Sequence, residues 1–289
     1  MKRRNFILTS LLATGAVTLS KFPYHLYAGT EKKYAWDRIK LGNAGVEVSR
    51  MAMGTGTNGG GKNSNQTRKL GFKGLSDLLR AAYDEGVTFW DSADSYGTHP
   101  HLKEALKSVP REKVVILTKA DIETADEMKS AIERYRQEIG TDYIDIILLH
   151  AVTNPNWRNE LKGPMEVLSE AKEKGLVRMV GISCHSFSAL EAAAEEPWVE
   201  LDLARWNPGG SRMDADVSVV KKALIKMKAN GKSIMGMKVL GQGDLLNKID
   251  ECLQFQLGSE FIDCFTIGVE NYDQFKDLVK RIPEASVRA

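Results

Sequence analysis

The chain contains few cysteines. Its 289 residues include only three, at Cys184, Cys252 and Cys264. Their number is odd and no two have C-x-x-C spacing, so neither a disulfide framework nor a cysteine zinc site is indicated. The folded protein is therefore expected to depend on its hydrophobic core for stability.

A strong excess of charge is also missing. The sequence has 40 Lys and Arg residues against 38 Asp and Glu residues, which leaves a net charge of +2 at pH 7. Four of the cations, Lys2, Arg3, Arg4 and Lys21, lie in the first 28 residues, where no acidic residue occurs. The remainder of the chain then carries −2. This balance offers no basic surface for nucleic acid to follow, so no nucleic-acid partner is expected.

A hydrophobic run long enough to span a membrane is missing as well. The apolar stretch at residues 6–19 has roughly 14 residues, short of the ~20 that a spanning helix needs. A basic head precedes it and a small residue, Ala28, follows it, as in a removable signal. The pair Arg3-Arg4 is typical of the twin-arginine export route. We therefore expect residues 1–28 to be an export signal peptide that engages the twin-arginine machinery and directs the protein to the periplasm, with no stable membrane anchor; a Sec-type leader is the alternative.

The rest of the sequence is a repeat of strand and helix patterns. Eight short apolar runs follow one another from about residue 51, and each is succeeded by a helical pattern. The runs are nearly continuous, as expected for parallel strands covered on both faces. Eight such units over roughly 250 residues predict a (β/α)8 TIM barrel. A doubly wound open sheet is the alternative, although that fold usually has fewer units and would need a usable glycine turn.

Two shorter strands precede the repeat. Residues 37–49 are expected to form a β-hairpin around the turn residues Asn43, Ala44 and Gly45. The predicted organisation is therefore an export signal followed by one barrel domain, residues 35–289, with the hairpin at its start.

A glycine motif follows the first barrel strand. Gly54, Gly56 and Gly59 match G-x-G-x-x-G, the phosphate-binding turn of dinucleotide-binding folds. In those folds the third glycine opens directly into a helix. Here a polar stretch follows, and the next helix is expected only near Leu75. We therefore interpret the match as a coincidence of the loop.

Polar and charged side chains stand at the ends of neighbouring predicted strands. Asp91 ends the second strand, Tyr96 lies just beyond it, Lys119 ends the third and His150 ends the fourth. Each alone has a structural explanation, such as a helix cap or core packing. Because active sites of TIM barrels lie where the C-terminal ends of the strands meet, the four together indicate a catalytic site.

The segments FWDSADSYG, ILTKA and DIILLH, which carry these residues, resemble the signature segments of the aldo/keto reductase family. The resemblance covers about residues 38–280, including the hairpin. It implies a catalytic tetrad in which Tyr96 is the proton donor and Asp91, Lys119 and His150 assist. It also implies NADPH or NADH as cofactor and a small-molecule carbonyl compound as substrate.

The implied tetrad is chemically reasonable. A tyrosine with its ordinary pKa of about 10 is a reluctant acid–base group near neutral pH. The ammonium of Lys119, held by Asp91, is expected to favour the phenolate and to lower the pKa of Tyr96. His150 would bond to the substrate oxygen, and the cofactor would supply the hydride.

The resemblance also implies which residues bind the cofactor. A Ser-Asn pair usually holds the nicotinamide carboxamide where this chain has Ser183 and Cys184, and His185 lies beside them. The family places an aromatic residue against the nicotinamide ring at the position of Trp206, for which ordinary core packing is the alternative. Loops after the seventh and eighth strands often bind phosphate. The full set expected at the cofactor is Gly56, Thr57, Ser183, Cys184, Trp206, Lys238, Gly241, Gly243, Gly268, Asn271 and Gln274.

The choice between the two cofactors is open at this point. Asn271 stands where the family often has an Arg or Lys for the adenosine 2′-phosphate. If NADPH is used, Lys238 or Arg212 would have to supply that charge; otherwise NADH is the cofactor.

Two other classes of function remain alternatives. A metal-dependent hydrolase on the same barrel could draw Zn²⁺ ligands from His99, His101, His150, His185 and Asp91. Lys119 argues against it, because it would place a cation among the ligands. The other alternative is a reductase-like binding protein without turnover.

Overall fold

The computed structural model describes residues 28–42 and 45–287. All of the expected export signal except Ala28, and the hairpin turn residues 43–44, lie outside the described residues. Within the described ranges, none of the helices combines the length and apolar character needed to cross a bilayer.

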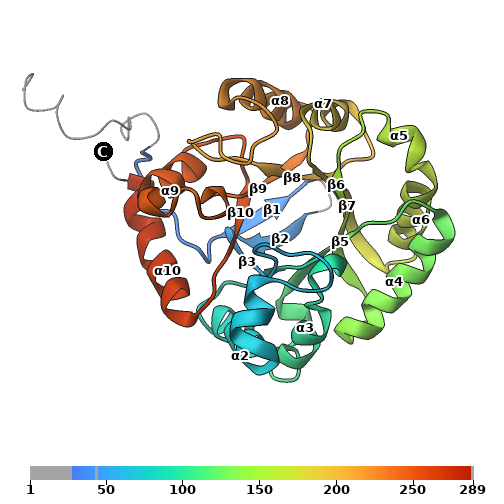
Figure 1. Ribbon diagram of the computed structural model, residues 1–289, viewed down its shortest axis with the longest axis horizontal. Helices are drawn as coiled ribbons and strands as arrows, with labels where there is room; N and C mark the ends of the chain where they lie inside the picture. Colours follow the sequence, from blue (N-terminus) through green and yellow to red (C-terminus); the bar gives the residue numbers. More distant parts are fainter. Residues whose placement is uncertain (1–27, 43–44, 288–289) are drawn as a thin grey trace, which may run out of the picture.

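Eight parallel strands close into a barrel (Figure 1). Each strand pairs with the next along the chain, and the last pairs with the first to complete the ring. The predicted (β/α)8 barrel is therefore confirmed. The barrel strands are β3 (Met51–Gly54), β4 (Phe89–Asp91), β5 (Val115–Ala120), β6 (Ile144–Val152), β7 (Val177–Cys184), β8 (Leu201–Arg205), β9 (Ser233–Met237) and β10 (Cys264–Gly268).

A ring of helices surrounds the barrel (Figure 1). Their apolar stripes face the strands; the stripe of α4 (Ala125–Ile139), for example, is buried at Met128, Ile132, Tyr135 and Ile139. The helices are α2 (Asn65–Asp84), α3 (His99–Ala105), α4 (Ala125–Ile139), α5 (Trp157–Glu160), α6 (Lys162–Glu173), α7 (Phe187–Glu195), α8 (Val217–Ala229), α9 (Ile249–Leu257) and α10 (Tyr272–Val287).

The predicted hairpin is also confirmed, and it closes one end of the barrel. β1 (Arg38–Leu41) and β2 (Val46–Ser49) pair antiparallel. Apolar side chains of the hairpin pack into the barrel interior. The hydroxyl of Ser49 accepts hydrogen bonds from backbone N–H groups at Thr88 and Phe89, where β4 starts. The hairpin thus covers the end where the strands begin, and their C-terminal ends remain as the open mouth.

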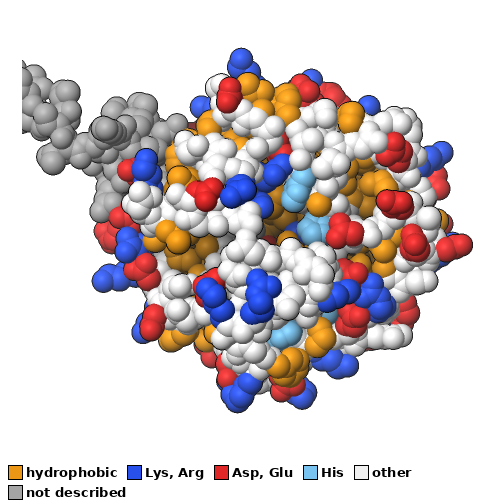
Figure 2. Space-filling view, viewed as in Figure 1, with side chains coloured by type: hydrophobic (Ala, Val, Ile, Leu, Met, Phe, Trp, Pro, Cys, Tyr) orange, Lys and Arg blue, Asp and Glu red, His pale blue; other side chains and the backbone are white. Residues whose placement is uncertain are grey.

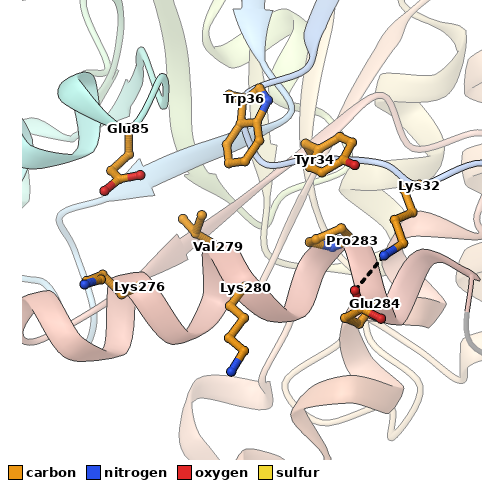
Figure 3. Close-up of a pocket in the computed structure, with 9 residues that line it drawn as sticks. All are labelled: Lys32, Tyr34, Trp36, Glu85, Lys276, Val279, Lys280, Pro283 and Glu284. Atoms are coloured by element: carbon orange, nitrogen blue, oxygen red, sulfur yellow. Dashed lines mark hydrogen bonds and ion pairs between the residues drawn. The ribbon is translucent and has the colours of Figure 1, made fainter.

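The segment before the hairpin runs along α10 (Figure 3). An ion pair of 2.7 Å joins Lys32 to Glu284 on that helix. A hollow of about 340 Å³ lies between this segment and α10, next to the stacked rings of Tyr34 and Trp36. None of the residues predicted for the functional site lines it.

One helix starts earlier than the sequence suggested. α2 begins at Asn65 rather than near Leu75. Ser64 caps it, because its hydroxyl accepts from the Thr67 N–H while the Thr67 hydroxyl accepts from the Ser64 N–H. Gly71, with φ of 64°, interrupts the helix. Before Leu75 the helix buries only Gln66, so this part of it has no apolar period in the sequence, which explains the error.

Candidate active site

The C-terminal strand ends surround a cavity of about 830 Å³. In Figure 2 it is the hollow in the middle of the visible face, with histidine side chains at its edge. The volume lies within the range of small-molecule binding sites. All four residues of the predicted tetrad line this cavity.

A buried ion pair forms one wall of the site. The Lys119 ammonium on β5 donates to a carboxylate oxygen of Asp91 on β4 and to the Ser92 carbonyl at 2.7 Å. Thr266 on β10 donates to the other Asp91 oxygen at 2.8 Å. The Lys119 side chain is 1% exposed and that of Asp91 is 7% exposed. Three strands therefore hold one charge pair away from water.

The environment of Lys119 keeps its amine charged. Burial by itself lowers the pKa of this amine, but the charge of the Asp91 carboxylate, which is bonded to it, acts in the opposite direction. The pKa of Lys119 is consequently raised above its ordinary value.

Tyr96 lies beside this pair at the end of a short 3-10 turn, η2 (Asp94–Tyr96). The Lys119 nitrogen is 4.9 Å from the centre of its ring. The pKa of Tyr96 is nevertheless raised, because burial raises it more than Lys119 lowers it, and Asp91 raises it further. The expectation of a lowered pKa was therefore wrong. The consequence is a phenol that stays protonated at neutral pH.

A β-bulge brings His150 to the same place. The register of β6 shifts between Leu149 and Val152, and Ala151 has φ of 52°. Bulges of this kind redirect side chains at the rims of barrels. The His150 ring is 5.8 Å from the Tyr96 ring, and its Nδ1 is 3.0 Å from a carboxylate oxygen of Asp121.

His185 joins the group from the end of β7. Its ring centre is 6.4 Å from that of His150, and it also lines the cavity. Burial lowers the pKa of His185 to about 3, with Arg205 and Lys238 acting in the same direction. Its imidazole is therefore neutral over the physiological range.

Behind the Tyr96 turn lies a network of charges. The Arg134 guanidinium on α4 donates to both Asp94 oxygens, at 2.8 and 2.9 Å, and to Glu138 at 3.0 Å. Lys62 also pairs with Asp94. Burial raises the pKa of Asp94, but these cations outweigh it and lower the pKa to about 2. His99 extends the network, with its two ring nitrogens 2.7 Å from Glu138 and 2.7 Å from a hydroxyl of β5.

The predicted zinc ligands do not converge. Among the described residues, Asp94, His99 and Glu138 form the one group of potential ligands close enough to share an ion. Only His99 of this group belongs to the predicted zinc set, and Arg134 and Lys62 already neutralise its carboxylates. The arrangement is an ion-pair network, and it gives the hydrolase alternative no support.

Comparison with known proteins decides the family. Residues 50–280 match the aldo/keto reductase family, a range that includes the four tetrad residues and most of the barrel. The chain belongs to the aldo/keto reductase family. The resemblance in the three signature segments is thereby confirmed.

Individual relatives are similar over part of their length. The chain is 29% identical over 159 residues to a probable aldo-keto reductase of Glycine max, covering 50% of this chain and 44% of that protein. It is 27% identical over 169 residues to the NADH-specific methylglyoxal reductase of Escherichia coli, covering 50% of this chain and 51% of that protein. The chain thus spans about half the length of these curated relatives.

The fold itself is similar over nearly its whole extent to solved members of the family. A putative aldo-keto reductase from Pseudomonas aeruginosa superposes with a TM-score of 0.70 at 23% identity. That match covers 88% of this chain and 97% of the other.

Most of the cofactor residues implied by the family do reach the cavity. Ser183 is notable among them, because its hydroxyl is buried and has no hydrogen-bond partner among the described residues. A hydroxyl without a partner in the wall of a cavity fits a polar ligand group such as a carboxamide. The implied residues that line the cavity are Gly56, Thr57, Ser183, Lys238, Gly243, Gly268 and Gln274.

Four implied cofactor residues lie outside the cavity lining, namely Cys184, Trp206, Gly241 and Asn271. Trp206 is buried, stacks on Phe255 with ring centres 4.7 Å apart, and donates to the hydroxyl of Ser259 at 2.9 Å. Of the two interpretations of Trp206, the structure supports core packing rather than contact with the nicotinamide ring.

The other three implied cofactor residues, Cys184, Gly241 and Asn271, make contacts within the protein. Cys184 is buried in the layer between strands and helices, and burial raises the pKa of its thiol. The Asn271 side chain accepts from the Gln274 N–H at 2.8 Å and so caps α10. Gly241 is buried close to Ser211. Arg212, the other proposed phosphate ligand, pairs with Asp244 at 3.5 Å and does not line the cavity.

Sequence reasoning missed several polar residues of the cavity wall, among them three with evident roles or positions. Asp121 holds His150, Thr266 holds Asp91, and Glu270 lies in the loop after β10. A signal existed for Asp121, which directly follows a strand end, and for Thr266, which is a polar residue inside an apolar run. Nothing in the sequence alone distinguishes Glu270 from other loop acids.

Proposed function

We propose that the protein is a carbonyl reductase that uses a nicotinamide cofactor to convert aldehydes or ketones to alcohols. The observation that carries this proposal is the meeting of a buried Lys119–Asp91 pair, the Tyr96 phenol and His150 at one cavity. Membership of the aldo/keto reductase family supports it. The activity named for the Escherichia coli relative also supports it.

The residues of this chain fit a nicotinamide cofactor. The unpartnered Ser183 hydroxyl can hold the carboxamide. Gly268 and the start of α10 offer backbone N–H groups of the kind that bind phosphate. When bound, the cofactor supplies a hydride to the carbonyl carbon of the substrate.

Each tetrad residue then has a distinct task. Tyr96 donates its phenolic proton to the carbonyl oxygen as negative charge develops there. Lys119, whose ammonium is 4.9 Å from the ring, stabilises the phenolate that remains. Asp91 keeps Lys119 charged and in place. His150, held by Asp121, orients the carbonyl group. The raised pKa of Tyr96 suits the reduction of a carbonyl group, because in that reaction Tyr96 starts in its protonated form and acts as the acid.

The proposal is tested with protein freed of metal by EDTA. Addition of NADH or NADPH should quench tryptophan fluorescence, and a panel of aldehydes, ketones and sugars should then oxidise the bound cofactor, followed by absorbance. Binding without oxidation across the panel would favour a binding protein without turnover. Activity that requires added zinc would favour a hydrolase.

We further propose that NADH is the preferred cofactor. In the family, the loop after the last barrel strand receives the adenosine end, and here Glu270 of that loop lines the cavity, with its carboxylate oxygens bonded to Asn65 and Lys69. A hydrogen bond from Lys69 lowers the pKa of Glu270, so the carboxylate is charged. A carboxylate accepts hydrogen bonds from ribose hydroxyls but repels a 2′-phosphate. Lys69, the cation nearest this acid, is already paired with it.

Glu270→Gln is expected to strengthen NADPH binding by about tenfold, or about 1.4 kcal/mol, because it removes the repulsion and frees Lys69. The wild-type protein is expected to bind NADH at least about tenfold more tightly than NADPH. Titration calorimetry with both cofactors measures the ratio of NADPH affinities between variant and wild type and the ratio of NADH to NADPH affinity in the wild type. The matched control is Glu166→Gln, which removes an exposed acid that pairs with Lys162 on α6 and does not line the cavity. Tighter binding of NADPH by the wild-type protein would contradict the proposal.

We also propose that the protein is exported by the twin-arginine route, on the basis of Arg3 and Arg4 ahead of the apolar stretch. A precursor with Arg3→Lys and Arg4→Lys should accumulate in the cytoplasm, because that route reads the arginine pair itself. Cell fractionation and immunoblotting measure the distribution. Undiminished export of the double variant would refute this route.

A further inference from the structure

We infer that the glycine turn Gly56–Gly59 is a seat that positions the ring of Tyr96 for proton transfer. The inference rests on the proposed role of Tyr96. On this inference the G-x-G-x-x-G match has a function, but that function is not the binding of phosphate.

The seat is defined by the space that its two glycines leave. A Cβ atom at Gly56 would come within 3.0 Å of ring atoms Cε2, Cδ2 and Cζ of Tyr96, closer than real Cβ atoms approach other atoms. A Cβ atom at Gly59 would come within 3.0 Å of Cδ1 and Cε1 of the same ring. The two glycines therefore contact both sides of the ring. The volume that side chains would occupy in this turn is filled by the tyrosine.

The turn is fixed in shape and joined to the segment that carries Tyr96. The Gly59 N–H donates to the Gly56 carbonyl at 2.9 Å, which closes the turn. The Lys62 N–H donates to the Ser95 carbonyl at 2.7 Å, and the Lys62 ammonium pairs with Asp94. The seat and the tyrosine turn thus form one unit.

Neighbouring glycines show that this close contact is specific to the two positions. A Cβ atom at Gly60 or Gly61 would have nothing within 4 Å. A Cβ atom at Gly54 would meet β10 instead, at the Thr266 hydroxyl. Of the three glycines in the motif, only the second and third face the Tyr96 ring.

The seat completes the surroundings of the phenol. The Lys119 nitrogen is 4.9 Å from the ring centre and the His150 ring is 5.8 Å away. A side chain at Gly56 would displace the ring, because the ring is the free end of its side chain whereas the turn is held by hydrogen bonds. Displacement of a reacting group by about 1 Å costs on the order of 10²-fold in rate.

The experiment compares Gly56→Ala with Gly60→Ala in the same loop. Gly56→Ala is expected to lower kcat at saturating cofactor by about 10²-fold. It is also expected to shift the pH profile of kcat, because the displaced phenol changes its burial and its distance from Lys119. Gly60→Ala is expected to keep the wild-type kcat and pH profile. Calorimetry with NADH is run on both variants.

Several results would overturn the inference. One is a Gly56→Ala protein with the kcat and pH profile of Gly60→Ala. Another is a loss of turnover that disappears at saturating NADH, since this would place Gly56 in cofactor binding alone. If Gly56→Ala does not fold, the double variant with Tyr96→Ala should fold, because the three nearest obstructing atoms belong to that ring. A double variant that still fails to fold overturns the seat.

Failure of the seat and failure of the proposed function are distinguishable. Tyr96→Phe is assayed in parallel, and wild-type turnover in that variant would remove Tyr96 from proton transfer. A slow Tyr96→Phe together with a fully active Gly56→Ala would instead overturn the seat and leave the proposed function standing.

Discussion

Tyr96→Phe is expected to lower carbonyl reduction by about 10³-fold while NADH affinity changes by less than about twofold. The substitution removes the proposed proton donor and keeps the ring in its place beside Lys119 and His150. The hydride can still be supplied, but the alkoxide that forms would have no acid next to it. Steady-state rates with saturating NADH and titration calorimetry measure the two quantities separately.

The matched control for this variant is Tyr143→Phe. Tyr143 directly precedes β6, at the end of the barrel opposite the mouth, and its ring lies under Arg111 at 4.2 Å. Loss of its hydroxyl should leave turnover unchanged. If Tyr96→Phe and Tyr143→Phe reduce carbonyl compounds at the same rate, the proton comes from another group.

Lys119→Met is expected to destabilise the protein by about 3–5 kcal/mol and to abolish turnover. The loss of stability arises because Asp91 would remain buried with only Thr266 as a side-chain partner for its charge. The loss of activity arises because the phenolate of Tyr96 would no longer be stabilised. Urea unfolding followed by circular dichroism measures the first effect and steady-state kinetics the second.

A double variant separates the two effects of the ion pair. Asp91→Asn combined with Lys119→Met removes both charges, so much of the stability should return while activity stays absent. Lys107→Met serves as control, because this lysine forms an exposed ion pair and should change stability by less than about 1 kcal/mol. Recovery of turnover in the double variant would show that the buried charges are not required for the chemistry.

The fold, and the meeting of the four proposed catalytic residues at one cavity, could be predicted because both depend on local signals. Continuous apolar runs identify parallel strands, and Asp91, Lys119 and His150 stand out as polar residues at strand ends. The start of α2 could not be predicted, since the helix buries only Gln66 before Leu75 and so has no apolar period there.

The packing and burial around individual residues, such as Trp206 and Tyr96, could not be predicted from the sequence. Trp206 ends its strand as the family pattern expects, yet Phe255, which lies far along the chain, packs against it and keeps it in the core. The pKa of Tyr96 depends on burial by the folded chain, so the sign of its shift could not be read from the charge of Lys119 alone.

The most direct test of the proposed chemistry is an isotope transfer experiment. EDTA-treated protein is incubated with NADH that carries deuterium in place of both hydrogens at C4 of the nicotinamide ring, together with a panel of carbonyl compounds that includes methylglyoxal. We predict an alcohol with deuterium on the former carbonyl carbon, formed in proportion to the NADH oxidised in wild type and almost absent in Tyr96→Phe. Alcohol formed without deuterium, or no NADH oxidation with any compound, would contradict the assignment of this cavity to carbonyl reduction.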